Sequence, residues 1–425
     1  MPNGASSAHL FQPKLAVALR EGYGGAALRA DVAAGLTVAV VALPLSMAIA
    51  VASGVSPERG LYAAIVGGLI VSALGGSRVQ IGGPAGAFIV LVAATAASHG
   101  LTGLLTAVLI SGVLMSVLGA LRVGSLMRHM PHAVTVSFTC AIAVVIAASQ
   151  LKDFAGLRLP GAEPGPFFPK LAALSSALPT LNPGALALGA GSAALILLLR
   201  RLRPSLPGML IAVTLAALLA WALKLPVETI GSRFGGIPRG LPAPSLPRID
   251  TAALLAALPA AISFTLLGAV ESLLSAKVAD RMTGRVHRSN MELVAQGLAN
   301  IASALFGGIC VTGTIARTAT NVRAGARTPV SGMLHSVFLL VFMIVAAPLA
   351  TYIPLAALAG VLLVVCWTMA EKAEFVQLLH RWPAATVALT TVALTLVRDL
   401  TTGIIAGCVL SAGFALLHQR LPEAG

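Results

Sequence analysis

Long apolar runs, separated by short breaks of glycine, proline and charged residues, fill the chain from residue 32 to residue 418. Many of these runs approach the ~20 residues that a helix needs to cross the hydrocarbon core of a bilayer. Dividing the chain at its breaks predicts about fourteen helical segments. The first seven are 32–52, 60–74, 84–98, 101–121, 131–150, 184–199 and 208–223. The second seven are 252–276, 292–306, 314–323, 329–347, 353–370, 383–397 and 401–418.

Two of these segments, 84–98 and 314–323, are too short to span a membrane. Each is the third segment of its half, and each follows a β-prone run that ends in glycine, at 79–83 and at 309–313. Because each half has an odd number of segments, the second half enters the membrane from the opposite side. The pattern therefore predicts an all-α polytopic membrane protein with two inverted seven-helix repeats and paired broken helices, an arrangement typical of transporters.

The same breaks predict how the chain is organised along its length. We expect a cytoplasmic N-terminal segment at 1–30, a first repeat at 31–224, an extracytoplasmic linker at 225–251, a second repeat at 252–418 and a short C-terminal tail at 419–425. The linker and the loop at 152–183 are rich in proline and glycine. We expect both to lie outside the membrane and to have little regular structure.

Composition supports the membrane assignment. Hydrophobic residues make up 57% of the 425 positions and charged residues only 10%, whereas soluble domains carry about 25% charged residues. The net charge of +14 raises the alternative of nucleic-acid binding, but no basic stripe with interleaved aromatic residues is present. The basic residues instead gather in the loops expected to face inward. These clusters are Arg200, Arg201 and Arg203, and Lys277, Arg281, Arg285 and Arg288.

This distribution of basic residues follows the positive-inside rule, so we expect both termini to be cytoplasmic in a bacterial inner membrane and no nucleic-acid partner.

The four cysteines are scattered singly, and no CxxC motif or His pair at metal-ligand spacing occurs. A Ser-His-Asp elbow, an HExxH motif and a P-loop are likewise absent from the sequence. We therefore expect no enzyme activity, no metal and no cofactor, and energy for uphill movement would come from an ion gradient.

The two short segments indicate what is transported. Two half-helices that begin near the membrane midplane direct their N-terminal dipoles and free N–H groups at one another, which favours an anion. Arg317, in the second half-helix, either adds positive charge to that site or neutralises a buried acid such as Glu271. Glu271 lies inside a long apolar segment, so it either carries a proton during transport or pairs with a nearby cation such as Lys277.

Three uncharged side chains are candidates for the same site, each with a structural alternative. Ser272 and Thr314 offer hydroxyl groups to a substrate, although hydroxyls in membrane helices also bond the backbone. Phe88, in the first half-helix, either lines a pocket or packs in the core.

Several sequence motifs, in order along residues 31–418, resemble the sulfate permease (SulP) family. They are AGLTVAVVALPL at 34–45, PERGLY at 57–62, VQIGGPAGAF at 79–88, ESLLS at 271–275, NMELVAQG at 290–297, FGG at 306–308, TG at 312–313 and IARTATN at 315–321. The resemblance implies fourteen helices in two inverted repeats, a core domain that moves against a gate domain, and a homodimer. It also implies small anions as substrates, among them sulfate, bicarbonate and dicarboxylates.

The resemblance further implies a binding site between the third and tenth helices, flanked by the first and eighth. The substrate-binding residues carried over to this chain are Leu45, Ile49, Ala85, Gly86, Ala87, Phe88, Ser272, Thr314, Ile315, Ala316 and Arg317, with Glu271 as the proton-coupling residue. Sodium-coupled bicarbonate members carry Asp where Glu271 stands, which favours a proton over sodium. Family members usually continue into a cytoplasmic STAS domain, which we expect to be missing from this chain, either naturally or because it was trimmed.

We therefore interpret the chain as a secondary active transporter of a small inorganic or carboxylate anion, such as sulfate, bicarbonate or fumarate. The expected mechanism is proton-coupled symport with an elevator-type movement. Two alternatives remain. One is an uncoupled anion channel or exchanger. The other is a nucleobase–cation symporter of the same fold, which is disfavoured because the tenth helix carries Arg317 in place of a carboxylate.

Overall fold

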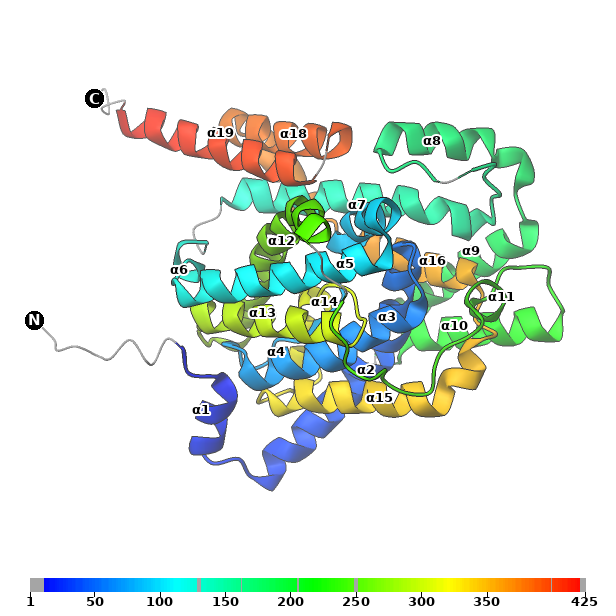
Figure 1. Cartoon of the computed structure of the whole chain (residues 1–425), viewed down its shortest axis with the longest axis horizontal. Helices are drawn as coiled ribbons and strands as arrows, with labels where there is room; N and C mark the ends of the chain where they lie inside the picture. The colour runs from blue at the N-terminus through cyan, green and yellow to red at the C-terminus, as the bar shows by residue number, and fades with distance from the viewer. Residues whose placement is uncertain are drawn as a thin grey trace, which may run out of the picture.

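The computed structural model describes residues 11–127, 131–161, 163–204, 206–247, 251–398 and 400–420. Residues 1–10 of the predicted N-terminal segment, 248–250 of the linker and 421–425 of the predicted tail lie outside the described residues. Almost all of the described chain is helical (Figure 1). The expected all-α class is therefore confirmed.

Most helices follow the predicted apolar segments closely. Those of the first half are α1 Lys14–Arg20, α2 Gly25–Ala52, α3 Pro57–Tyr62, α4 Gly68–Leu74, α5 Ile89–Ala120, α6 Gly124–Met127, α7 His132–Ala155, α8 Phe167–Ser176, α9 Pro183–Leu202 and α10 Gly208–Ala222. The later ones are α11 Ile230–Phe234, α12 Thr251–Thr283, α13 Ser289–Leu305, α14 Ile315–Arg323, α15 Val330–Ala350, α16 Leu355–Met369, α17 Lys372–Leu379, α18 Trp382–Val397 and α19 Leu400–Arg420. Short turns of other helix types lie at Ala63–Gly67, Gly86–Phe88 and Leu178–Thr180.

Several of these helices can span a bilayer. Within the described residues, six helices are long and apolar enough to cross, and α16 with α17, bent by 41°, would make a seventh. Helices α10 and α18 and most of α19 are apolar but shorter. The chain is a multi-pass membrane protein, while the number of fourteen spans stays a prediction.

The predicted break between segments 84–98 and 101–121 is real but local. A 3-10 turn at Gly86–Phe88 leads directly into α5, which continues to Ala120. The interruption falls at Gly100, where φ is 65° and ψ is −174°. A residue with a Cβ atom is strained at this positive φ, so glycine allows the chain to change direction between two helical stretches.

The expectation of little regular structure in the two proline-rich loops is wrong in part. The loop at 152–183 contains the ten-residue helix α8, whose Leu174 packs with Leu157 and Ala177, while Lys170 pairs with Glu163 at 2.9 Å. The linker contains the short helix α11, which begins with a reciprocal Thr229–Ser232 capping box. Local capping and one buried apolar face are enough to order these segments.

The two β-prone runs meet in the middle of the fold. Only two residues of each run form a strand, β1 at Gly82–Gly83 and β2 at Thr312–Gly313. The strands pair antiparallel, with Gly82 opposite Gly313 and Gly83 opposite Thr312. This pairing brings the starts of α5 and α14 together from opposite halves of the sequence, as the broken-helix pattern predicts.

The helices form two bundles, and each takes members from both halves. Helices α2, α4, α5, α12, α13, α14 and α15 pack mainly on one another, and so do α7, α9, α10, α16, α18 and α19. In Figure 1 the blue and cyan helices α2 to α5 lie beside the green and yellow helices α12 to α15. The bundles meet where α2 packs on α16 and α10, and where the turn Gly86–Phe88 packs on α7. This arrangement matches the expected core and gate.

Candidate functional site

Side chains from α14 hold the non-helical backbone that precedes α5. The Ile81 N–H donates to Thr318 Oγ1 at 3.1 Å, and Asn321 Nδ2 donates to the Val79 carbonyl at 2.9 Å. The Thr314 N–H donates to the Ile81 carbonyl at 3.0 Å. Backbone at membrane depth needs such partners because water is absent there.

The second non-helical run, at 309–313 before α14, is held by α13 instead. We call the runs at 79–83 and 309–313 the first and the second crossover. Asn300 bonds both backbone groups of Val311, accepting from its N–H and donating to its carbonyl, each at 2.8 Å. Ser303 Oγ donates to the Ile309 carbonyl at 2.6 Å. The sequence motifs do not assign this role to Asn300, Ser303, Thr318 or Asn321. Their sequence signal is an amide and a hydroxyl three residues apart on each helix, Asn300 with Ser303 on α13 and Thr318 with Asn321 on α14.

The starts of both half-helices are open. Neither Ala85, before the turn Gly86–Phe88, nor Thr314, before α14, caps the following turn with its side chain. The Thr314 hydroxyl donates instead to the Ile81 carbonyl at 3.3 Å. The first N–H groups of a helix have no partner within the helix. Uncapped, they combine with the positive end of the helix dipole to favour an anion.

Arg317 lies in the first turn of α14 with only 2% of its surface exposed. Its Nη2 donates to Ser46 Oγ at 3.1 Å and to the Pro84 carbonyl at 3.3 Å, which joins α14 to α2 and to the start of the first half-helix. Its Nε and Nη1 have no hydrogen-bond partner among the described residues. The side chain fits because Gly83 has no Cβ; one built there would lie 1.9 Å from Nη1.

Glu271 lies on α12 and is half-buried. Its Oε2 has no hydrogen-bond partner in the described part of the chain, and no ion pair between described residues includes it. The sequence left open whether Arg317 neutralises Glu271, and in this conformation the two do not form an ion pair. Each is a buried or half-buried ionisable group with unused hydrogen-bonding atoms.

The neighbouring hydroxyl of Ser272 is already engaged. It lies 2.7 Å from the Thr312 hydroxyl and accepts the Gly313 N–H at 3.2 Å. The Ser272 carbonyl also accepts from Gln80 Nε2 at 3.0 Å. In this conformation Ser272 fixes β2 and connects it to the first crossover.

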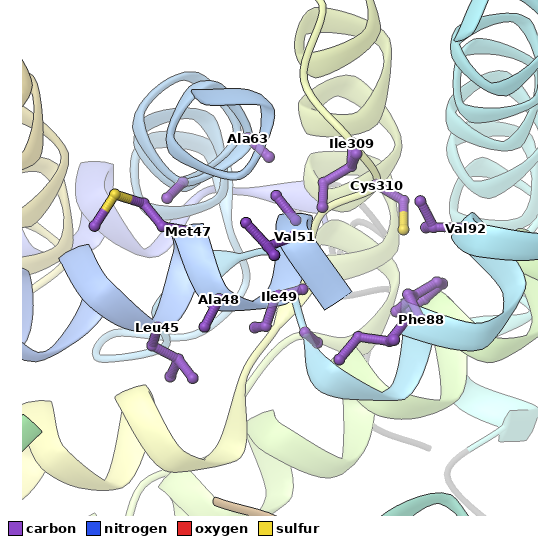
Figure 2. Close-up of a cluster of buried hydrophobic side chains, with 14 of the residues drawn as sticks. Leu45, Met47, Ala48, Ile49, Val51, Ala63, Phe88, Val92, Ile309 and Cys310 are labelled. Carbon is purple, nitrogen blue, oxygen red and sulfur yellow. The ribbon is translucent and has the colours of Figure 1, made fainter. Parts of the chain in front are cut away.

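The remaining predicted residues form an apolar wall. Leu45 and Ile49 on α2 and Ala85, Ala87 and Phe88 at the first half-helix are all buried. Figure 2 shows Ile49 facing the helix start that carries Phe88. The Phe88 ring also stacks on Phe264 of α12, with 5.9 Å between the ring centroids.

The predicted site residues therefore come together from α2, the start of α5, α12 and α14. Gly86 and Ile315 are half-buried, and Ala316 is exposed, so this face is partly open. Two apolar cavities, of about 440 and 580 Å³, lie at the boundary between the bundles. One lies among α2, α10 and α15 and the other among α5, α12, α18 and α19, and no predicted site residue lines either.

One further polar cluster lies at the connection of α12 and α13. His287 Nδ1 is 2.6 Å from Asp280 Oδ2, and His287 Nε2 is 3.0 Å from Ser289 Oγ. Ser289 begins α13 and is buried. The three residues join two core helices, and the buried serine is not presented to a substrate.

Comparison with known proteins agrees with this geometry. The sequence profile described as the sulfate permease family matches residues 28–395. The chain is 40% identical over 407 residues to the "Putative sulfate transporter YvdB" of Bacillus subtilis (strain 168), covering 95% of this chain and 76% of that protein. It is 33% identical over 362 residues to the bicarbonate transporter BicA of Picosynechococcus sp., covering 82% of this chain and 63% of that protein.

Solved structures show the same fold. The transmembrane domain of a cyanobacterium bicarbonate transporter BicA matches with a TM-score of 0.81 and 30% identity, covering 91% of this chain and 98% of that one. The murine anion transporter Slc26a9 matches with a TM-score of 0.88, covering 99% of this chain and 73% of that one. At 18% identity the second likeness concerns the fold alone.

These findings define a multi-pass membrane transporter built from two bundles around paired broken helices. The chain belongs to the sulfate permease family. Its class of function is therefore anion transport, and it is a transporter, not an enzyme, as the sequence predicts.

Proposed function

We propose that this chain is a secondary active transporter that moves a small anion together with a proton. The observation that carries the proposal is Arg317, a buried guanidinium beside two uncapped helix starts, with two nitrogen atoms that have no partner in the described part of the chain. A buried charge without a partner costs several kcal/mol, on the order of 3–5 when a partner is removed. An anion at this point would offset that cost.

The anion would lie between the helix starts at residues 85–88 and 314–317. There it would receive backbone N–H groups from both half-helices and the free side of the Arg317 guanidinium. Leu45, Ile49 and Phe88 would exclude water and limit its size. Ser272 would act indirectly, because its hydroxyl holds Thr312 and Gly313 at the start of α14.

The names of the relatives favour sulfate or bicarbonate as the substrate. Fumarate and similar dicarboxylates remain candidates because the same helix dipoles and guanidinium would bind a carboxylate. Selectivity would follow from the volume left by the apolar wall.

Glu271 is the proposed proton carrier. An ionised carboxylate inside a membrane segment is costly, and in such positions acids commonly form part of proton pathways. Its Oε2 has no hydrogen-bond partner among the residues that the structure describes, so it can gain or lose a proton without breaking a hydrogen bond to them. Protonation would remove the negative charge while the anion is loaded.

The proposed movement is a shift of the core bundle against the gate bundle. All of the proposed site residues lie on core elements, so the site would move as a unit. The two apolar cavities at the bundle boundary leave room for such a shift. We also propose the two repeats at 31–224 and 252–418, a homodimer in a bacterial inner membrane and cytoplasmic termini, as the positive-inside pattern favours.

Uptake into proteoliposomes tests the function. The purified chain is reconstituted with labelled sulfate, bicarbonate, fumarate and succinate outside and an inward proton gradient, and Glu271→Gln is run beside the wild type. We expect one anion to accumulate only with the gradient. Glu271→Gln should lose accumulation but keep exchange of anion already present on both sides.

Three results would contradict parts of the proposal. Anion current without accumulation would favour the channel alternative. Accumulation that needs a sodium gradient would replace the proton. Normal accumulation in Glu271→Gln would exclude this residue from coupling.

A further inference from the structure

A second ionisable side chain lies near Arg317 and has no part in the function proposed above. His335, on α15, is 0% exposed, and neither ring nitrogen has a hydrogen-bond partner among the described residues. Buried polar atoms in native proteins nearly always have partners, so each exception needs an explanation. A histidine is also the side chain whose charge changes most readily near neutral pH.

The charged group on the neighbouring helix is Arg317. Asn321 Nδ2 of α14 donates to Ser331 Oγ of α15 at 2.9 Å, and Arg317 and His335 each lie four residues, about one helical turn, from that contact. Among the elements packed against α15, α4 and the turn Ala63–Gly67 carry no ionisable side chain. Helix α2 carries Arg29 and Asp31 near its N-terminal end. Asp31 is fully engaged there by Tyr23 and by the backbone and side chain of the Arg327–Thr328 segment. No acid therefore compensates the charge of Arg317 on this side in the described chain.

The unused polar atoms in this part of the core bundle belong to different helices. Nε and Nη1 of Arg317 come from α14, and both imidazole nitrogens come from α15. Ser72 Oγ, on α4, also has no partner within the described ranges and faces Gly332, three residues before His335. Water molecules bridge unpaired groups of this kind in protein interiors. Such a bridge would also carry a proton to the imidazole.

We propose that His335 takes up a proton when an anion binds at Arg317 and releases it when the anion leaves. A positive imidazole beside an uncompensated guanidinium is unfavourable, because like charges repel strongly in a medium of low dielectric constant. The anion removes that repulsion by neutralising Arg317. One N–H bond forms on the imidazole and one O–H or N–H bond breaks in a buffer acid or hydronium ion of the solution to which the site is open, so the conjugate base stays in that solution.

This inference rests on the proposed anion site at Arg317 and adds a residue to its mechanism. Glu271 would set how the proton gradient drives transport, whereas His335 would make the affinity for the anion depend on pH. The anion and the proton would bind with positive cooperativity, because each favours the other by the same factor.

Calorimetry tests the inference without requiring transport. Sulfate and bicarbonate are titrated into the purified chain at pH 7 in buffers of different ionisation enthalpy, which yields the number of protons taken up per anion bound. His335→Gln keeps a polar side chain of similar size but cannot be charged. We expect it to take up fewer protons than the wild type by as much as ~1 per anion. Its anion affinity at pH 8 should stay within ~3-fold of the wild type, since the imidazole is neutral there.

His99→Gln is the matched control, because His99 is exposed near Gly100 and the variant should behave as the wild type. If His335→Gln does not fold, ¹⁵N spectra of histidine-labelled wild type give the answer directly. Saturating anion should convert one histidine from the neutral to the protonated form.

Anion binding with unchanged proton uptake in His335→Gln, or with no change in any histidine signal, overturns the role of His335 alone. Failure of both anions to bind the wild type overturns the anion site on which this inference rests.

Discussion

In the first crossover the backbone of Val79 and Ile81 is held by side chains from α14, whereas in the second the backbone of Ile309 and Val311 is held by side chains from α13. Both crossovers end in a two-residue strand and an uncapped helix start. The backbone is therefore repeated, while the side chains that support it are not.

The two helix starts also differ in charge. The first begins with Gly86, Ala87 and Phe88, which contribute small size and an apolar surface. The second carries Arg317, which reaches across to the Pro84 carbonyl of the first. A symmetric pair of dipoles is thus combined with one asymmetric charge. We infer that the dipoles provide general affinity for anions and that Arg317 decides how tightly an anion is held.

The largest expected effect is on anion affinity, and it tests the difference in charge between the two helix starts. Arg317→Gln should lower anion affinity by ~10- to 100-fold, because a charge-assisted hydrogen bond is worth about 1.5–3 kcal/mol. Arg323→Gln is the matched control, since Arg323 is exposed at the other end of the same helix. Titration of the purified variants with sulfate and bicarbonate measures both. Equal affinities would assign Arg317 a purely structural role.

The next effect concerns the supports of the crossovers. Asn300→Ala should destabilise the protein by ~2–3 kcal/mol, because it leaves both backbone groups of buried Val311 without a partner. Asn321→Ala should cost less, since it leaves only one backbone group, the Val79 carbonyl, without its amide donor. Unfolding midpoints in the same detergent compare the two. A larger loss of stability in Asn321→Ala would mean that the first crossover depends more on its side-chain support than the second does.

A smaller effect on anion affinity is expected from the contact between Arg317 and Gly83 of β1. A Cβ at Gly83 would meet Arg317 Nη1, so Gly83→Ala should displace the guanidinium and weaken anion binding by ~10-fold, about 1.4 kcal/mol. A Cβ at Gly313 would meet the Gln80 amide instead, so Gly313→Ala should lower stability more than affinity. Paired affinity and melting measurements distinguish them. Loss of affinity in both to the same extent would contradict this division.

The smallest effect should come from single hydroxyls. Thr318→Val removes the acceptor of the Ile81 N–H, and Ser303→Ala removes the donor to the Ile309 carbonyl. Each should cost ~1 kcal/mol of stability, the usual net value of one hydrogen bond. Anion affinity should fall more in Thr318→Val, because Thr318 lies one position after Arg317. Affinity and melting measurements on both variants test this order. An equal fall in anion affinity in Thr318→Val and Ser303→Ala would refute it.

Much of this architecture could be predicted because membrane helices obey a simple constraint. Each span must be long and apolar, so 131–150 and 184–199 could be read from the sequence within about five residues of the ends of α7 and α9, and 101–121 matches the part of α5 after the break at Gly100. The glycines at 82–83 and 313 and the short segments after them likewise located the broken helices. Helices α8 and α11 were missed because their order comes from capping and local packing, which are weak signals in a proline-rich loop.

The candidate site was predicted only in part. A carboxylate at 271 and an arginine at 317 stand out in apolar surroundings, and the resemblance to the sulfate permease family supplied the rest of the set. The engagement of the Ser272 hydroxyl by Thr312 and Gly313 could not be read from spacing, because it joins positions about forty apart. His335 was passed over because one histidine in an apolar run carries no signal of its own.

The sequence by itself determined that this chain is a polytopic membrane protein, since lipid imposes length and hydrophobicity on every span. It also marked where the helices break, since only glycine and polar residues tolerate irregular backbone at that depth. The tertiary structure alone decided which partners that backbone finds, and whether Arg317 and Glu271 neutralise one another. Those outcomes depend on how α2, α12, α13, α14 and α15 pack side by side, and residues hundreds of positions apart come within hydrogen-bonding distance only in the folded chain.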